Sequence, residues 1–488
     1  MKMYILRTWA LWVRGLILAP LSVSLVALFT GYAYAAVKFA RTYGGGNNDW
    51  AYSVRQTSDG GYIIAGSTTS FGAGNRDIFL IKTDAYGNVQ WAKTYGGPNI
   101  DYATSVQQTS DGGYILAGET FSSGAGSGDA FLIKTDAFGN IQWAKTYGGI
   151  GAEGFASVQQ TSDGGYIAVG WTWSPGFSAG NNDFFVIKTD AFGNIQWAKT
   201  YGGTGFELAH SVQQTSDGGY IIAGWTTSFG AGSFDFLLIK TDANGNVQWA
   251  KAYGGAGLDT TYSVQQTSDG GYIIAGYTNS FGAGSFDFFV IKTDAYGSVQ
   301  WAKTYGGTNQ DKAHYVQRTS DGGYIIAGYT NSFGASSFDF LLIKTDANGN
   351  VQWAKTYGGT GTEGLLLHSS SPAQQTSDGG YIIAGFTNSY GVGNWDIFLI
   401  KTDANGDIGS CGIVRNVNPA EMTLGSLLTV TTISLAALSV RTLSLTPGSP
   451  AIYINNPTLA ISTPCPLSDD NELGISESCK PVSGLITP

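Results

Sequence analysis

The chain has 488 residues, 71 of them glycine, with 12% charged residues and a formal net charge of −10. The negative charge argues against nucleic acid or an anionic membrane as the main partner. A chain of this length is too long for one ordinary hydrophobic core unless its fold is modular, and abundant glycine with few charged residues is typical of many short strands joined by tight turns.

Residues 1–36 have the pattern of a secretory signal peptide. Three basic residues precede an apolar run over residues 15–29, and "AYA" at residues 33–35 supplies a small-x-small cleavage motif. An uncleaved membrane anchor is the alternative interpretation. We expect a protein that is secreted or held at the cell surface, with the periplasm as an alternative compartment, and no membrane insertion after the signal is removed.

A repeat follows the signal and dominates the chain. The phrase "TSDGGY" recurs seven times at intervals of 52 to 57 residues, with its aspartates at Asp59, Asp111, Asp163, Asp217, Asp269, Asp321 and Asp378. Repeats of this length are typical of propellers and solenoids, whose units need neighbours to bury their faces.

A typical unit, Ser211–Gly255, divides into four strands. "SVQQT" and "YIIAG" flank a Ser-Asp-Gly-Gly turn, and "FLLIKT" is joined to "VQWAKAY" by an Asp-Ala-Asn-Gly-Asn turn. Asp-Gly is a strong hairpin signal because its turn needs a positive φ. Continuously apolar strands are buried on both faces, whereas the alternating last strand is a half-buried outer strand. Seven such units predict an all-β, seven-bladed β-propeller over residues 37–408.

The two ends of the repeat array complete each other. The seventh unit breaks off after "LIKTDANG", while "KFARTYGG" stands alone at the front as an orphan copy of the "WAKTYGG" strand, with Phe39 in the tryptophan position. An open ring would leave an unpaired edge strand. We therefore predict that the Val37–Tyr43 strand closes the last blade by pairing with Phe398–Thr402.

From Lys38 to about Ile408 the chain resembles propeller-repeat proteins exported by many bacteria and archaea, whose unit reads like "TSDGGYIIAG…DFLLIKTDANGNVQWAKTYGG". The resemblance implies a seven-bladed ring at or beyond the cell surface and brings no shared activity. "TDANGNVQW" is also similar to the quinoprotein repeat and "DGGYIIAG" faintly to kelch, but the quinoprotein Thr-Gly before tryptophan is absent, so these indicate a common fold without common chemistry.

The tight turns occupy one end of the ring, here called the turn face, and the longer connections occupy the other, here called the loop face. Each "YGG" on the loop face is followed by an acid, at Asp49, Asp101, Glu153, Glu207, Asp259, Asp311 and Glu363. At separations of about 10 Å in water these charges repel by only roughly 0.4 kcal/mol per pair, so the ring needs no cation. We expect them to make loop hydrogen bonds.

Metal ligands are not expected. The "DANGN" turn suggests calcium, but four of its seven copies place an aromatic residue where a ligand oxygen would be needed. His210 and His314 occupy matching positions in non-adjacent blades, and His368 lies in an insertion of blade seven. We therefore predict no metal site and no cofactor.

Residues on the loop face that differ from one repeat to the next are the best candidates for functional residues. The residue that follows the "AG" or "VG" of the second strand is Ser67, Glu119, Trp171, Trp225, Tyr277, Tyr329 or Phe386, and blade three adds Trp173 and a two-residue insertion. Aromatic rings beside carboxylates suit saccharides, although packing between blades is the alternative. The predicted ligand-binding residues, in three neighbouring blades, are Glu119, Trp171, Trp173, Glu207, His210 and Trp225.

The sequence thus favours a non-catalytic binding or adhesion module for a polysaccharide or cell-surface glycan. A glycan-acting hydrolase or lyase is the first alternative, but Glu119 is the only acid that breaks the repeat on the loop face and it has no evident singular partner, so an enzyme is the weaker interpretation. A structural cell-surface component is the second alternative. The sequence names neither the ligand nor the oligomeric state.

Behind the ring, residues 428–447 show a five-residue period of β-prone segments, from which we expect a small β-rich module over 409–466, followed by a flexible tail over 467–488. A transmembrane segment over 422–440 is the less favoured alternative. The three cysteines all lie in this region and permit at most one internal disulfide. We favour Cys411–Cys465 over Cys465–Cys479.

Overall fold

A computed structural model of the chain describes residues 36–335, 337–365, 371–409, 412–424, 427–434, 436–437, 439–443, 453–455, 460–465 and 483–484. The predicted signal peptide, apart from residue 36, and most of the predicted flexible tail lie outside these ranges. Within them, the structure holds no helix of the length and apolarity needed to cross a membrane.

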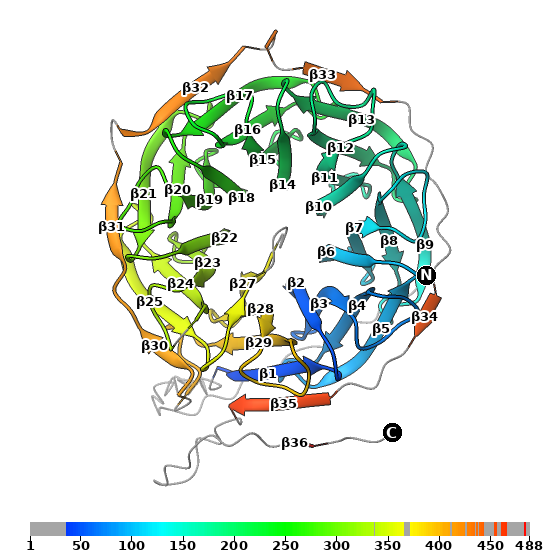
Figure 1. Cartoon of the computed structure of the whole chain (residues 1–488), viewed down its shortest axis with the longest axis vertical. Coiled ribbons are helices and arrows are strands. Elements are labelled where there is room, and N and C mark those ends of the chain that lie inside the picture. The colour runs from blue at the N-terminus through cyan, green and yellow to red at the C-terminus, as the bar shows by residue number, and fades with distance from the viewer. Residues whose placement is uncertain are drawn as a thin grey trace, which may run out of the picture. The chain divides into compact units, whose positions relative to one another are not determined.

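Seven antiparallel sheets stand side by side in a ring, which confirms the predicted seven-bladed β-propeller (Figure 1). Blades one to six each contain four strands in chain order, and blade seven contains β26 to β29 with β1. The strands are β1(Phe39–Gly44), β2(Asp49–Gln56), β3(Tyr62–Thr68), β4(Asp77–Thr83), β5(Val89–Gly96), β6(Asp101–Gln108), β7(Tyr114–Thr120), β8(Asp129–Thr135), β9(Ile141–Tyr147), β10(Glu153–Gln160), β11(Tyr166–Thr172), β12(Asp183–Thr189), β13(Ile195–Gly202), β14(Glu207–Gln214), β15(Tyr220–Thr226), β16(Asp235–Thr241), β17(Val247–Gly254), β18(Asp259–Gln266), β19(Tyr272–Thr278), β20(Asp287–Thr293), β21(Val299–Gly306), β22(Asp311–Arg318), β23(Tyr324–Thr330), β24(Asp339–Thr345), β25(Val351–Tyr357), β26(Glu363–Gly364), β27(Ala373–Gln375), β28(Tyr381–Thr387) and β29(Asp396–Thr402).

The second and third strands of each blade form the core between neighbouring sheets. All seven residues of β3 and of β4 are buried, as continuous apolar runs predict. Ile63 and Leu80 pack with Leu116 and Phe131 of the next blade in one cluster. Burial on both faces therefore makes each blade depend on its two neighbours.

The "TSDGGY" turn carries an ion pair that is repeated in every blade. In blade one Gly60 takes φ 83°, a conformation that glycine adopts without steric cost. Asp59 accepts hydrogen bonds from the Gly61 N–H at 3.1 Å and from Lys82 Nζ at 2.8 Å, and Lys82 is almost fully buried. The same Lys–Asp pair occurs in all seven blades. The aspartate and lysine of the repeat thus fix the turn.

Ring closure by the N-terminal strand is confirmed. β1 pairs antiparallel with β29, with Phe39 opposite Lys401 and Tyr43 opposite Ile397. The Phe39 ring lies 6.0 Å from the Tyr62 ring of the next blade. The Trp91 ring lies 5.9 Å from Tyr114 in the same way, so Phe39 takes the place of the repeat's tryptophan. The orphan strand therefore fills the place of the strand that the seventh repeat lacks.

The C-terminal segment runs around the outside of the ring (Figure 1), adding single strands to the outer edges of the blades. The sequence predicted a small β-rich module or stalk packed against the ring over residues 409–466. The described strands of this region lie on the edges of the blades and form no sheet of their own. The segment visits blades six, five, four, three, one and seven in that order. Its strands are β30(Val414–Asn416) on β25, β31(Ala420–Thr423) on β21, β32(Thr429–Ile433) on β17, β33(Ser439–Thr442) on β13, β34(Tyr453–Asn455) on β5 and β35(Ala460–Cys465) on β1.

We call the segment from Val414 to Cys465 the belt. Each of its strands pairs with an alternating outer strand, whose edge would otherwise face solvent with unpaired backbone groups. Ile413, Leu424 and Ile433 are buried in the clusters between blades. A short strand from the predicted flexible tail, β36(Ser483–Gly484), pairs with β35. The predicted disulfides stay predictions, because Cys411 and Cys479 lie outside the described residues.

Candidate functional site

The acids that follow "YGG" are buried and hold the loops of the loop face. All seven are at most 1% exposed. Glu207 accepts hydrogen bonds from the Gly203 N–H at 2.7 Å and from Thr226 Oγ1 at 2.6 Å. The glycine N–H bond recurs in every blade. Loop hydrogen bonding is therefore the role of these carboxylates, as the sequence predicted.

A second buried acid in each blade escaped the sequence reasoning. It begins the third strand, at Asp77, Asp129, Asp183, Asp235, Asp287, Asp339 and Asp396, and each is at most 2% exposed. A Cβ added at Gly202 would lie 2.1 Å from Asp183 Oδ1 and 2.7 Å from Glu207 Oε2, so only glycine fits between the two carboxyl groups. The signal was present, because an aspartate precedes the apolar third strand in all seven units.

These carboxyl pairs titrate unlike exposed acids. Burial raises the pKa of Asp183 to about 6, with the Ala179 N–H opposing the shift and the neighbouring Glu207 carboxylate adding to it. Burial raises the pKa of Asp287, Asp339 and Asp396 to about 6 as well. Two like charges in one low-dielectric site favour a proton on one of them.

Glu119 lies at the loop-face end of β7, but it does not face open solvent. It is 5% exposed and accepts a hydrogen bond from the Tyr102 hydroxyl. Burial raises the pKa of Glu119 to about 7, although the hydrogen bond from Tyr102 opposes the shift. The Arg76 guanidinium lies 4.5 Å from the Trp50 ring and 5.2 Å from the Tyr102 ring. Glu119 thus belongs to a packed polar and aromatic cluster of blades one and two.

The three predicted tryptophans differ in exposure. Trp171 is 8% exposed and packs with Ala156 and Leu208, with the half-buried Trp225 against them. Trp173, directly after β11 on the loop that is two residues longer in blade three, is 56% exposed. The structure therefore brings the tryptophans of blades three and four together, but only Trp173 presents most of its surface to solvent.

His210 is a buried residue of the inner strand β14. Its ring lies 4.3 Å from the Tyr262 ring, and His314 lies 4.5 Å from the other side of the same tyrosine. The two histidines thus share one aromatic stack, although their blades are not adjacent. His368 lies outside the described residues, and within the described ranges no three His, Cys, Asp or Glu side chains form a cluster that could hold a metal ion.

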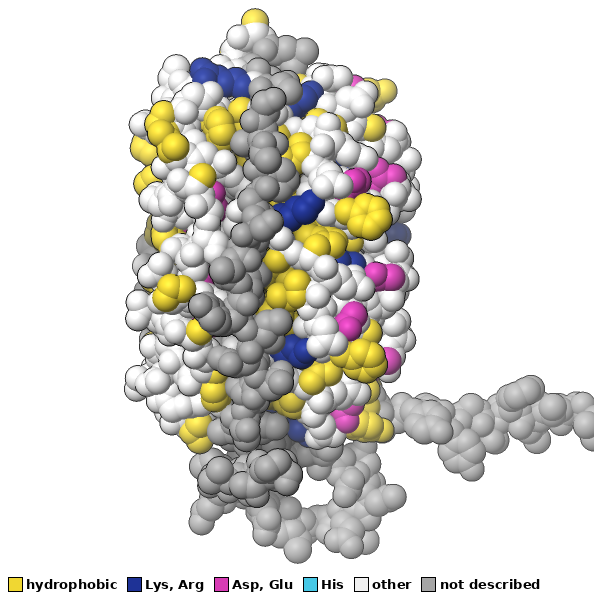
Figure 2. Space-filling view, turned by 90° about the vertical axis from the view of Figure 1, so that its right-hand side faces the viewer, with side chains coloured by type: hydrophobic (Ala, Val, Ile, Leu, Met, Phe, Trp, Pro, Cys, Tyr) yellow, Lys and Arg dark blue, Asp and Glu magenta, His cyan; other side chains and the backbone are white. Residues whose placement is uncertain are grey.

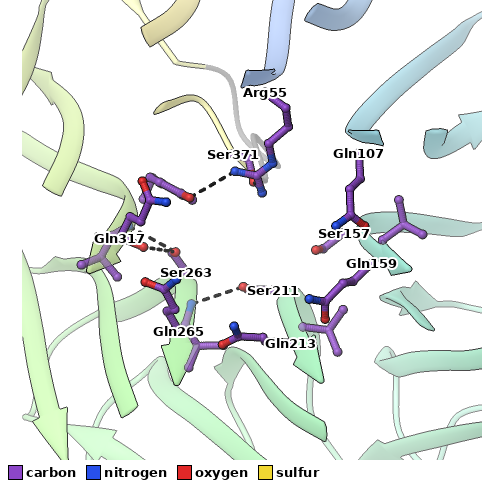
Figure 3. A pocket seen from close by; sticks show the side chains of 15 residues that line it. Arg55, Gln107, Ser157, Gln159, Ser211, Gln213, Ser263, Gln265, Gln317 and Ser371 are labelled. Atoms are coloured by element: carbon purple, nitrogen blue, oxygen red, sulfur yellow. Dashed lines mark hydrogen bonds between the residues drawn. The ribbon is translucent and has the colours of Figure 1, made fainter. Parts of the chain in front are cut away.

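The centre of the ring is a polar channel lined by the inner strands. Serine and glutamine side chains of the "SVQQ" motif converge on it (Figure 3), enclosing a cavity of about 180 Å³. Ser263 Oγ accepts from the Val316 N–H of the next blade at 3.2 Å, and Gln265 Oε1 accepts from the Arg318 N–H at 2.6 Å. Equivalent bonds link most other neighbouring inner strands. The motif therefore joins the blades to one another.

Arg55 is the one charged residue among the seven equivalent channel positions, the other six being glutamine. Its guanidinium donates to the Tyr315 hydroxyl at 3.2 Å and to Ser371 Oγ (Figure 3). Tyr315 likewise replaces a serine of the repeat. Arg55 and Tyr315, the two residues that differ from the repeat, contact each other next to Ser371, where the inner strand of blade seven is divided into β26 and β27. The positions that break the sequence repeat therefore lie where the ring departs from its sevenfold regularity.

The fold and its site define a seven-bladed β-propeller repeat protein. Residues 33–256, less than half of the chain, match the family model described as Holdfast attachment protein D. A curated relative, Regulatory protein FlaEY of Caulobacter vibrioides, is 26% identical over 195 residues, which are 37% of this chain and 20% of that protein. The chain thus spans only a fifth of that relative's length.

Solved structures with similar folds are distant. Sqt1 from Chaetomium thermophilum has a TM-score of 0.38 at 10% identity, covering 76% of this chain and 99% of that one. A eukaryotic initiation factor has a TM-score of 0.34 at 9% identity, covering 76% of this chain and 100% of that one. Such weak similarities carry no functional argument, so function must be argued from this chain's own surface.

Proposed function

We propose that this protein is a cell-surface propeller that acts in adhesion as a non-catalytic binding module. The match of residues 33–256 to a family described by holdfast attachment supports a surface location and an adhesive role. The buried carboxylates support a binding function over a catalytic one, since the acids of the loop face are occupied with loop hydrogen bonds. The rigid ring serves as a scaffold for its surface loops.

The ligand we propose for the loop face is a glycan, and the observation that carries this proposal is Trp173. Its indole is 56% exposed on a loop that is two residues longer in blade three than in the other blades, and such an exposed aromatic side chain is typical of a contact surface. Trp173 is the stacking residue of this proposal, and the half-buried Trp225 of the neighbouring blade packs against Trp171. Trp171, Glu119, Glu207 and His210 are buried, so we assign them to the packing of this sector and not to direct ligand contact.

The test is glycan retention by the mature protein on an array of bacterial surface polysaccharides. Trp173→Ala should remove at least one polysaccharide from the set that the protein retains and leave the melting temperature unchanged, because the side chain is mostly in solvent. Ile150→Ala is the matched control, since Ile150 is an exposed apolar residue of a neighbouring loop. A set of retained polysaccharides that Trp173→Ala leaves unchanged would refute a loop-face site.

A further inference from the structure

The turn face exposes a second set of aromatic side chains, at the tips of the hairpins that join the third and fourth strands. Tyr86, Phe138, Phe192 and Tyr296 are 51% to 75% exposed, and they lie between the Asp and the Gly of the "DAxG" turn. Figure 2 shows the side of the ring that carries β9, where large hydrophobic side chains stand beside acidic ones along one edge. Blades four, six and seven have asparagine at the same position.

The turn itself does not need these aromatic rings. The Phe192 N–H donates to Asp190 Oδ1 at 2.8 Å, and the Asn244 N–H donates to Asp242 Oδ1 at the same distance. The hairpin is therefore identical with either residue at its tip. The hydrogen bonds of the turn therefore do not account for the aromatic rings at four of the seven tips.

Phe192 borders a groove of about 650 Å³ between blades two and three. Trp143 of β9 lines the groove as well, and its Nε1 donates to the Ala191 carbonyl at 3.2 Å, which ties the indole to the base of the neighbouring tip. The Trp143 ring is held from behind by the Tyr166 ring at 5.8 Å. A half-buried indole and an exposed phenyl ring thus stand in a groove whose size is that of a small-ligand site.

Polar groups complete the groove. Lys134 Nζ lies 2.8 Å from Asp111 Oδ2 and donates to Gln142 Oε1 at 3.0 Å. Asp111 keeps half of its side chain in solvent, and Gln142 is exposed. Because the ion pair neutralises its own charge, the groove offers hydrogen-bonding groups without a strong field of either sign. Flat apolar faces beside uncharged or neutralised polar groups match an uncharged sugar, whose C–H faces stack and whose hydroxyls hydrogen-bond.

We propose that the turn-face grooves with an aromatic tip bind neutral saccharides. The groove at Trp143 and Phe192 is one of three places where the outer-strand tryptophan of one blade lies beside an aromatic-tipped turn of the next, the other two being Trp91 with the Phe138 turn and Trp249 with the Tyr296 turn. The tip Tyr86 is excluded because its partner Phe39 is fully buried. Three sites on one rigid ring would raise the avidity for a polymer well above the affinity of one groove.

This inference goes beyond the loop-face site and shares with it only the premise of a glycan ligand. The two sites lie at opposite ends of the ring and contain different residues. A variant of one therefore leaves the other intact, so failure of either proposal is visible separately.

The asparagine tips of this chain supply the test variants. The triple change Phe138→Asn, Phe192→Asn and Tyr296→Asn installs the residue that blades four, six and seven already carry, so the hairpins should keep their hydrogen bonds. Binding of cellohexaose and chitohexaose to the mature protein is measured by isothermal titration calorimetry. The triple variant should bind the accepted hexasaccharide at least tenfold more weakly, whereas Trp173→Ala should bind it like the parent.

The reverse changes complete the experiment. Asn244→Phe and Asn348→Phe place an aromatic tip beside Trp197 and Trp301, and the number of hexasaccharides bound per chain should rise. Equal binding by the parent and the triple variant would overturn the proposal, as would a parent that binds neither hexasaccharide. An unchanged melting temperature of the triple variant shows that a loss of binding is not a loss of fold.

Discussion

At the scale of single residues, most polar side chains of the repeat stabilise the ring. Lys82 holds the Asp59 turn, Ser263 and Gln265 join neighbouring inner strands, and Glu207 fixes a loop. Their recurrence in most or all blades indicates such structural roles. The residues that depart from the repeat, such as Arg55, Trp173 and the aromatic tips, are the ones that these roles leave unexplained.

The buried carboxyl pairs predict an unusual pH dependence of stability. The pKa of Asp183, Asp287, Asp339 and Asp396 is raised to about 6 in the folded state, so the folded protein binds these protons more tightly than the unfolded chain. Their contribution to stability is complete below pH 4 and is lost as the pH rises through 6. Thermal melts should therefore show a higher melting temperature at pH 5 than at pH 7.5.

The ion-paired aspartates of the turn face predict the opposite pH dependence of stability at acid pH. Burial acts to raise the pKa of Asp111. The hydrogen bonds from Lys134 and Thr109, together with the lysine charge, outweigh it and lower this pKa to about 2. That contribution is present above pH 4 and is lost as the pH falls toward 2, so stability should peak near pH 4 to 5. Asp287→Asn should slightly reduce the fall in melting temperature between pH 5 and pH 7.5. It should not change the fall in melting temperature below pH 4. A melting temperature that rises steadily from pH 5 to 7.5 would contradict the assignment.

At the scale of elements, closure depends on one strand from the far end of the chain. β1 is buried along all six residues and is covered on its outer side by β35. Its removal would expose the apolar edge of β29 and break the ring between blades six and one.

We therefore predict that changes to the closing strand β1 lower the stability of the whole ring. Deleting Val37–Tyr43 should lower the melting temperature markedly, and Phe39→Ala alone should cost about 3 kcal/mol because its ring is fully buried. Lys38→Ala is the control, since its partner Asp403 lies 3.8 Å away near the surface and such pairs contribute less than about 1 kcal/mol. If the deletion and Phe39→Ala proteins both melt like the parent, β1 does not stabilise the closed ring.

At the scale of the whole molecule, the belt begins on blade six and ends on blade seven, the blade from which the chain leaves the ring. The chain leaves β29 of blade seven, passes along the outer strands, and ends with β35 beside β1 of the same blade. A covalent link between the two ends of the belt would fasten it around the ring.

A Cys411–Cys465 disulfide would be that link. It would close a loop of 54 residues in the sequence, worth on the order of 4 kcal/mol in the chain-entropy model. Peptide mapping of the unreduced mature protein should recover the Cys411 and Cys465 peptides joined, and reduction should lower the melting temperature. Recovery of a joined Cys465–Cys479 peptide would contradict the Cys411–Cys465 pairing. As a control, Cys479→Ser should change neither the joined peptides nor the melting temperature.

The sequence by itself determined the blade count, the four strands of each blade and the closing strand. These follow from local chemistry that every copy repeats, namely Asp-Gly turns, apolar periods and the missing "WAKTYGG" phrase. It also placed Trp173 on a solvent-exposed loop. The tertiary structure decided what no local pattern records: the course of the belt, the pairing of Asp183 with Glu207, and the burial of Trp171. Each of these depends on which distant segment covers an edge or a face, and only the closed ring brings those segments together.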